Sequence, residues 1–176
     1  MCSAAPLERP ELCPECQLDH SDVVWLLGPS APDAWTSATT GERMEAELTP
    51  DICILPYRGR MRFFIRGHIQ LPIAGRDPFV WSVWAEVDEA AMDSMLRTWN
   101  HPNRAGLPQL AGRIANELPY EQPTRELPVM IANRDPGMVP LLMVSKGCGH
   151  VLAWEQRDGV TQHRVAQLAE RLAHLC

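Results

Sequence analysis

Two cysteines and a histidine near the start of the chain carry its sharpest chemical signal, in the spacing Cys13-x-x-Cys16-x-x-x-His20. Two thiolates on one tight turn, with an imidazole one turn later, can converge on a single tetrahedral metal ion. This motif supplies three ligands at most. Soft ligands gather again only at Cys148-Gly-His150, so a fourth ligand there would tie the N-terminal turn to the segment before the last helix.

Two other interpretations of this motif stay open. In one, Cys13 and Cys16 are ordinary thiols and His20 is a surface side chain, because a single Cys-x-x-Cys is weaker evidence for zinc than a doubled one. In the other, the two thiols form a redox dithiol, although no strand–helix–strand pattern surrounds them.

A further cysteine, Cys53, lies in an apolar stretch and is expected to be a small buried side chain. The alternative makes Cys53 a nucleophile that is activated by Asp51 and His68.

The strongest structural pattern is the alternation of apolar and polar residues through 58–87, which predicts a hairpin of two half-buried strands. If residues 74–78 form the loop, Leu71 pairs with Trp81 and Arg66 pairs with Glu86. Its polar face, formed by Arg66, His68, Trp84 and Glu86, is a candidate binding face, although such a face is more often covered or solvated.

Helices must pack against this sheet. Asp88 is a good N-cap for an amphipathic helix, and Thr161 caps the strongest helical pattern, at the C-terminus. A second hairpin is expected from 127–132 and 139–144. We therefore predict an α+β fold with an antiparallel sheet built on the central hairpin, as a single domain over 13–176 behind a flexible lead-in at 1–12.

Composition narrows the classes of function. The net charge of −6 argues against a nucleic-acid partner, and the apolar run at 23–27 is too short to span a membrane. Residues 1–12 lack the pattern of a signal peptide, so we expect a cytoplasmic location, where cysteines stay reduced. The sequence also lacks a phosphate-binding glycine loop, a His-Glu-x-x-His zinc motif and a Gly-x-Ser-x-Gly elbow.

Several segments together resemble a bacterial family, the domain of unknown function 2199. They are the Cys13 to His20 motif, Asp51-Ile-Cys53, Phe63-Phe-Ile-Arg-Gly67, Phe79-Val-Trp-Ser-Val-Trp84, Leu118-Pro-Tyr120 and His150-Val-Leu-Ala-Trp-Glu-Gln156. The resemblance implies the ligand set Cys13, Cys16, His20 and His150, and it also supports Cys53. Cys148 lies outside the family pattern and is the substitute ligand if His20 points away. Gln17 and Val151 depart from it, since the family has Gly and Pro at these positions.

The function expected from these observations is that of a non-catalytic protein-binding or adaptor domain, stabilised by a structural zinc ion, with no catalytic residues. The alternative is a metal-dependent or cysteine-dependent enzyme in which the Cys/His cluster activates water.

Overall fold

The computed structural model describes residues 13, 15–17 and 25–175 of the chain, so the predicted lead-in at 1–12 and the side chain of His20 lie outside the described residues. The elements, in which η marks a short 3₁₀ helix, are β1 (Leu26–Leu27), α1 (Asp33–Ser37), α2 (Thr40–Met44), β2 (Glu47–Leu48), β3 (Ile52–Tyr57), β4 (Arg60–Ile73), β5 (Arg76–Val87), α3 (Glu89–Thr98), η1 (Arg104–Gly106), β6 (Leu110–Ile114), β7 (Pro128–Ala132), β8 (Leu141–Val144), η2 (Lys146–Cys148), α4 (Val151–Asp158) and α5 (Gln162–Leu175).

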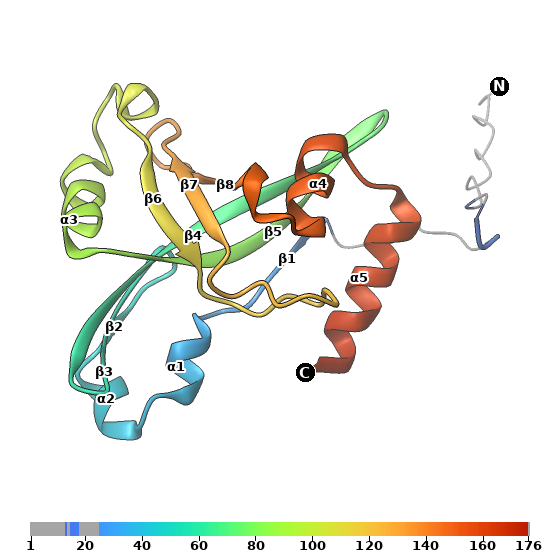
Figure 1. Ribbon diagram of the computed structural model, residues 1–176. Helices are drawn as coiled ribbons and strands as arrows, with labels where there is room; N and C mark the ends of the chain where they lie inside the picture. Colours follow the sequence, from blue (N-terminus) through green and yellow to red (C-terminus); the bar gives the residue numbers. More distant parts are fainter. Residues whose placement is uncertain (1–12, 14, 18–24, 176) are drawn as a thin grey trace, which may run out of the picture.

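The strands in the described part of the chain form one eight-stranded sheet in the order β1-β5-β6-β7-β8-β4-β3-β2, and β5 also pairs with β4. That extra pairing closes β4, β5, β6, β7 and β8 into a barrel. Figure 1 shows α3 on one side of this barrel and α4 and α5 on the other. The α+β class is confirmed, but the predicted antiparallel sheet is wrong in part, because β8 joins β4 and β1 joins β5 in parallel.

The central hairpin is confirmed as β4 and β5, but its predicted register is wrong by two residues. Trp81 pairs with Ile69, and Leu71 pairs with Phe79. The turn is shorter than expected, because Gly75 has a φ of +71° and lets Ile73 pair with Arg76. The register then shifts once between Leu71 and Ile73, beside prolines that cannot donate to the ladder.

Other local predictions are confirmed by cap contacts and by pairing. Asp88 accepts a hydrogen bond from the Ala91 N–H at the start of α3, and Thr161 accepts one from the Arg164 N–H at the start of α5. The second hairpin is β7 and β8. The sequence analysis missed α1, β6 and α4, which are short or lie in proline-rich stretches with weak periodicity.

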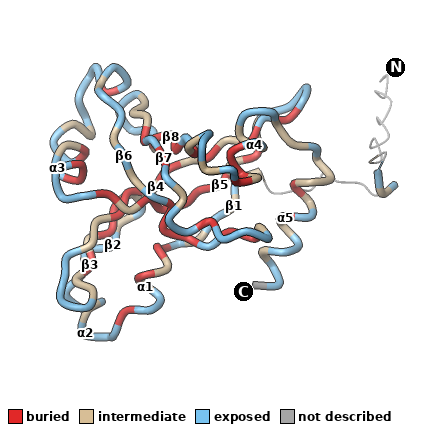
Figure 2. The backbone as a smooth tube through the Cα atoms, viewed as in Figure 1, coloured by how far each residue is buried: buried red, intermediate tan, exposed pale blue. Residues whose placement is uncertain are grey.

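Two apolar clusters flank the central strands, where Figure 2 shows that buried residues concentrate. The larger cluster fills the barrel and extends to Met95 of α3, Leu152 of α4 and Val165 of α5. The smaller cluster packs Trp84 and other residues of β3–β5 under α1. Both faces of β4 and β5 are therefore covered over part of their length.

Gly67 allows β4 and β8 to approach each other where the barrel closes. A Cβ atom at this position would lie 2.4 Å from Cγ of Leu142, and Leu142 is fully buried. Gly67→Ala should therefore lower the free energy of unfolding by roughly 1–3 kcal/mol through overpacking, as measured by urea denaturation.

Gly106→Ala is the matched control, because a Cβ atom there meets nothing within 4 Å. Its stability should stay close to that of the wild type. Equal stability of the Gly67 and Gly106 variants would contradict the close approach of β4 to β8.

Candidate metal centre

The structure brings Cys13 and Cys16 together with His163, a residue that the sequence analysis did not select. One ligand atom from each of these three residues lies within 4.8 Å of the other two. The cysteines come from the N-terminal turn (residues 13 and 15–17), and His163 comes from the first turn of α5. Two thiols and an imidazole at this separation are the donor set that tetrahedral zinc prefers.

The sulfur atoms of Cys13 and Cys16 lie within 4.8 Å of each other in the N-terminal turn. The Gln17 N–H donates a 2.8 Å hydrogen bond to the Cys13 carbonyl oxygen, which closes the turn around Cys16. Gln17 has a φ of +60°, in the left-handed region that favours glycine. This is the position at which the family resemblance has Gly, so the chain adopts the glycine conformation with a glutamine.

His163 is held by neighbours from both of the elements that meet here. Its Nε2 lies 3.0 Å from the side-chain amide nitrogen of Gln167, one helical turn along α5, and 3.9 Å from a carboxylate oxygen of Glu15 in the N-terminal turn. A histidine that binds metal through Nδ1 carries its proton on Nε2, where an amide oxygen or a carboxylate orients the ring. The Glu15 carboxylate is suited to that role, whereas the Gln167 amide nitrogen is a donor only, so Gln167 would fill the role only with its amide oxygen turned toward Nε2.

His150, which the sequence analysis placed among the ligands, has another role. It caps α4: its Nδ1 accepts a hydrogen bond from the Leu152 N–H, which leaves the ring proton on Nε2 to be donated to the Gln122 carbonyl oxygen at 3.1 Å. Both ring nitrogens are therefore used within the fold. Neither His150 nor the substitute Cys148 belongs to the three-residue group in the described part of the chain.

The four residues of the predicted binding face take part in contacts within the protein. Trp84 is fully buried, and its Nε1 donates to the Pro29 carbonyl oxygen. Arg66 stacks 4.9 Å from the Trp84 ring centre and donates to the Ser30 carbonyl oxygen. A partner would reach Trp84 only after the loop at residues 29–30 moved.

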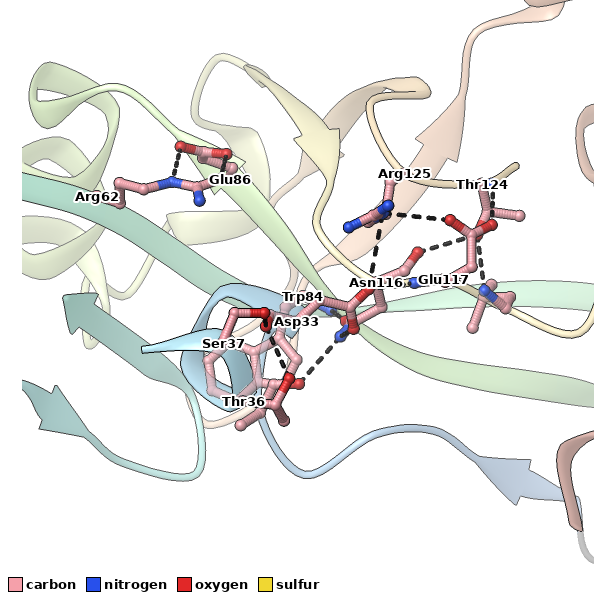
Figure 3. Close-up of polar contacts among 12 residues, drawn as sticks. Asp33, Thr36, Ser37, Arg62, Trp84, Glu86, Asn116, Glu117, Thr124 and Arg125 are labelled. Atoms are coloured by element: carbon pink, nitrogen blue, oxygen red, sulfur yellow. Dashed lines mark hydrogen bonds and ion pairs between the residues drawn. The ribbon is translucent and has the colours of Figure 1, made fainter. Parts of the chain in front are cut away.

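The other two residues of that face, Glu86 and His68, make different contacts. Glu86 pairs with Arg62, instead of Arg66, through two hydrogen bonds (Figure 3). His68 is half-buried, and burial together with Arg134 and Arg66 lowers the pKa of its imidazole. Folding therefore favours the neutral form of the His68 imidazole over the protonated form.

A polar network joins α1 to the loop that follows β6 (Figure 3). The buried Asn116 accepts a hydrogen bond from the Trp84 N–H and donates to Asp33 and to the Ala31 carbonyl oxygen. Asp33 also accepts from the Glu117 N–H at 2.9 Å. These contacts satisfy buried polar groups, which would otherwise cost about 1–3 kcal/mol each.

Cys53, the candidate nucleophile, is fully buried in β3. Burial raises the pKa of its thiol to about 12. A nucleophilic cysteine requires the opposite shift, because the thiolate is the reactive form. The environment of Cys53 therefore matches the expectation of a small core side chain.

No signal in the local sequence marks His163 as a ligand. It is a single histidine next to the Thr161 cap, outside the apolar stripe of α5, and only the tertiary fold carries it to the N-terminal turn. The sequence does mark the two thiols, because their spacing is local.

The fold and the candidate metal centre together define a mixed barrel domain with a Cys-Cys-His group that joins the N-terminal turn to α5. The chain belongs to a family described as an uncharacterized protein conserved in bacteria (DUF2199), whose profile matches residues 12–160. The match includes both cysteines and ends before His163. No curated protein and no solved structure matches the chain, and none of its described helices has the length and apolarity needed to cross a membrane.

The raised pKa of Cys53 leads to a test of thiol reactivity. Under native conditions at pH 8, iodoacetamide should leave Cys53 unmodified, whereas Cys148, which is half-buried, should react. In urea both should react, as measured by peptide mass spectrometry. Native modification of Cys53 at the rate of Cys148 would instead indicate an accessible, activated thiol.

Proposed function

We propose that this protein is a non-catalytic, protein-binding domain in which a structural zinc ion fastens the N-terminal turn to α5. The observation that carries the metal assignment is the convergence of Cys13, Cys16 and His163 within 4.8 Å. A zinc ion there would bond to all three of these side chains, and its binding free energy would add to the stability of the folded protein.

The fourth ligand in this proposal is His20, which lies outside the described residues. Its spacing from Cys16 suits a single tetrahedral ion, and His150 is excluded from the proposed set because its ring nitrogens cap α4 and bond Gln122. The proposed ligand set is therefore Cys13, Cys16, His20 and His163.

The raised pKa values of Cys53 and Tyr120 support the non-catalytic part of the proposal, because both side chains stay protonated. Cys53 is a buried thiol with a raised pKa. Burial and the adjacent Glu155 carboxylate raise the pKa of Tyr120 well above its usual value, so Tyr120 is a neutral hydrogen-bond donor at pH 7. A domain of this kind acts through binding, and we propose that its partner is another protein.

The competing function is a metal-dependent enzyme with the same two thiols, one histidine and a water in the fourth position. Cobalt substitution followed by X-ray absorption distinguishes the two functions. Two sulfur and two nitrogen donors support the structural role, whereas two sulfur donors, one nitrogen and one exchangeable oxygen support the enzyme.

The metal assignment predicts one equivalent of zinc per chain by elemental analysis of protein purified in the reduced form. Cys13→Ser and His163→Gln should each lose most of this zinc, because each removes one of only a few ligands. Chelator should lower the melting temperature of the wild type and leave that of Cys13→Ser unchanged.

Two histidine variants are the controls for this experiment. His174→Gln, at an exposed position of the same helix, should keep full zinc content. His150→Ala should also keep its zinc and lose about 1 kcal/mol of stability, because it removes a helix cap. Zinc loss in His150→Ala with zinc retained in His163→Gln would overturn the ligand set, and purified wild type without stoichiometric metal would overturn the zinc site itself.

The left-handed conformation of Gln17 predicts a gain of affinity. Gln17→Gly removes the cost of placing a side chain at positive φ and should tighten zinc binding about two- to fivefold in a competition titration. Gln17→Ala keeps a Cβ atom and should bind like the wild type. An equal gain in both variants would show that backbone strain at this residue is not the cause.

A further inference from the structure

A second candidate site lies where α4 and α5 meet the loop after β6. A cavity of about 250 Å³ is lined there by Tyr120, Glu121, Gln122, His150, Val151, Arg164 and Arg171. Two segments that carry the family resemblance, 118–120 and 150–156, meet at this cavity, and the metal centre uses neither of them. The cavity is therefore a candidate site separate from the candidate metal centre.

Two arginines of α5 line the cavity, and each is paired with a carboxylate. Arg164 and Arg171 are seven residues apart and therefore lie on the same face of α5 after two helical turns. The side chain of Arg164 is 26% exposed and is held by a 2.7 Å bond from Nε to Glu155 and by the Tyr120 ring below its guanidinium. Within the described residues the Arg164 guanidinium forms its hydrogen bond through Nε alone, so both terminal nitrogens can bind a ligand.

Arg171 is held much less tightly. Its guanidinium lies 3.6 Å from the Glu121 carboxylate, and the Glu121 side chain is 86% exposed. An exposed pair of this kind contributes little to stability, so a bound anion can replace Glu121 at small cost. Glu121 competes with such an anion for Arg171.

The first turn of α4 adds a main-chain donor to the wall. The Leu152 N–H donates to His150 Nδ1, and the Ala153 N–H donates to the His150 carbonyl oxygen. The Val151 N–H has no acceptor among the described residues, although Val151 lines the cavity. Main-chain N–H groups at the start of a helix and arginine guanidinium groups both donate hydrogen bonds to phosphate oxygens.

We propose that this cavity binds the phosphate group of a small molecule, with Arg164, Arg171 and the Val151 N–H as its donors. Phosphate offers enough oxygens to accept from both guanidinium groups and from the main chain at the same time. The cavity is larger than a phosphate ion, so the remainder of the ligand would contact Tyr120 and Gln122. This site does not depend on the proposed zinc ion.

Titration of the wild-type protein with inorganic phosphate at constant ionic strength, followed by ¹H–¹⁵N NMR, tests the proposal. Saturable shifts are expected at the Val151 amide and the Arg164 Nε–H. Arg171→Gln should weaken binding about three- to tenfold, and Glu121→Gln should strengthen it about twofold. Arg97→Gln is the matched control, since it removes the same charge at an exposed site on α3 and should leave affinity unchanged.

Val151→Pro removes the main-chain donor without changing the charge. His150 has φ −88° and ψ 143°, a conformation that accepts a following proline, and proline is favoured at the first position of a helix. This variant should therefore keep its fold and bind phosphate about three- to tenfold more weakly.

The proposal is overturned if the wild type shows no saturable phosphate response, or if Arg171→Gln and Val151→Pro bind phosphate as tightly as Arg97→Gln. Acetate is titrated in parallel. Tighter binding of acetate than of phosphate would overturn the assignment to phosphate.

Discussion

The closure of the barrel at β4 is the constraint on which the rest of the structure depends. β4 pairs with β3, β5 and β8, and its contact with β8 is a short parallel pairing in which the His68 N–H donates to the Pro140 carbonyl oxygen at 2.9 Å. Gly67 makes room there for the buried Leu142 side chain. Because β8 leads through η2 into α4 and α5, the same closure places every C-terminal residue discussed above.

Three hydrogen bonds attach the C-terminal helices to that closed barrel. The Gln156 side chain of α4 bonds the main chain of β8 at both Val144 and Leu142. The Val160 N–H, between α4 and α5, donates to the Pro72 carbonyl oxygen of β4 at 2.8 Å. The start of α5 is thereby tied to the sheet. This arrangement explains how a histidine near the end of the chain can lie at a defined place beside the N-terminal turn.

Polar side chains in this fold mostly hold elements together. Arg66 and Trp84 fasten the loop at residues 29–30, and Asn116 joins α1 to the sheet. Buried polar groups must be satisfied within the protein, since water cannot reach them. The two proposed sites differ from this pattern. The His163 imidazole lies beside the two thiols, and the side chain of the next residue, Arg164, lines the cavity.

The sequence by itself determined the features that depend on neighbours in the chain. These were the alternating hairpin, the Asp88 and Thr161 caps and the pair of thiols in the N-terminal turn, since strand alternation, helix capping and Cys-x-x-Cys spacing are local. The tertiary structure decided the hairpin register, through a tight turn at Gly75 that the loop composition does not specify. It also decided the parallel closure of the barrel and the position of His163, rather than His150, beside the two cysteines, because contacts between distant segments depend on how the whole chain packs.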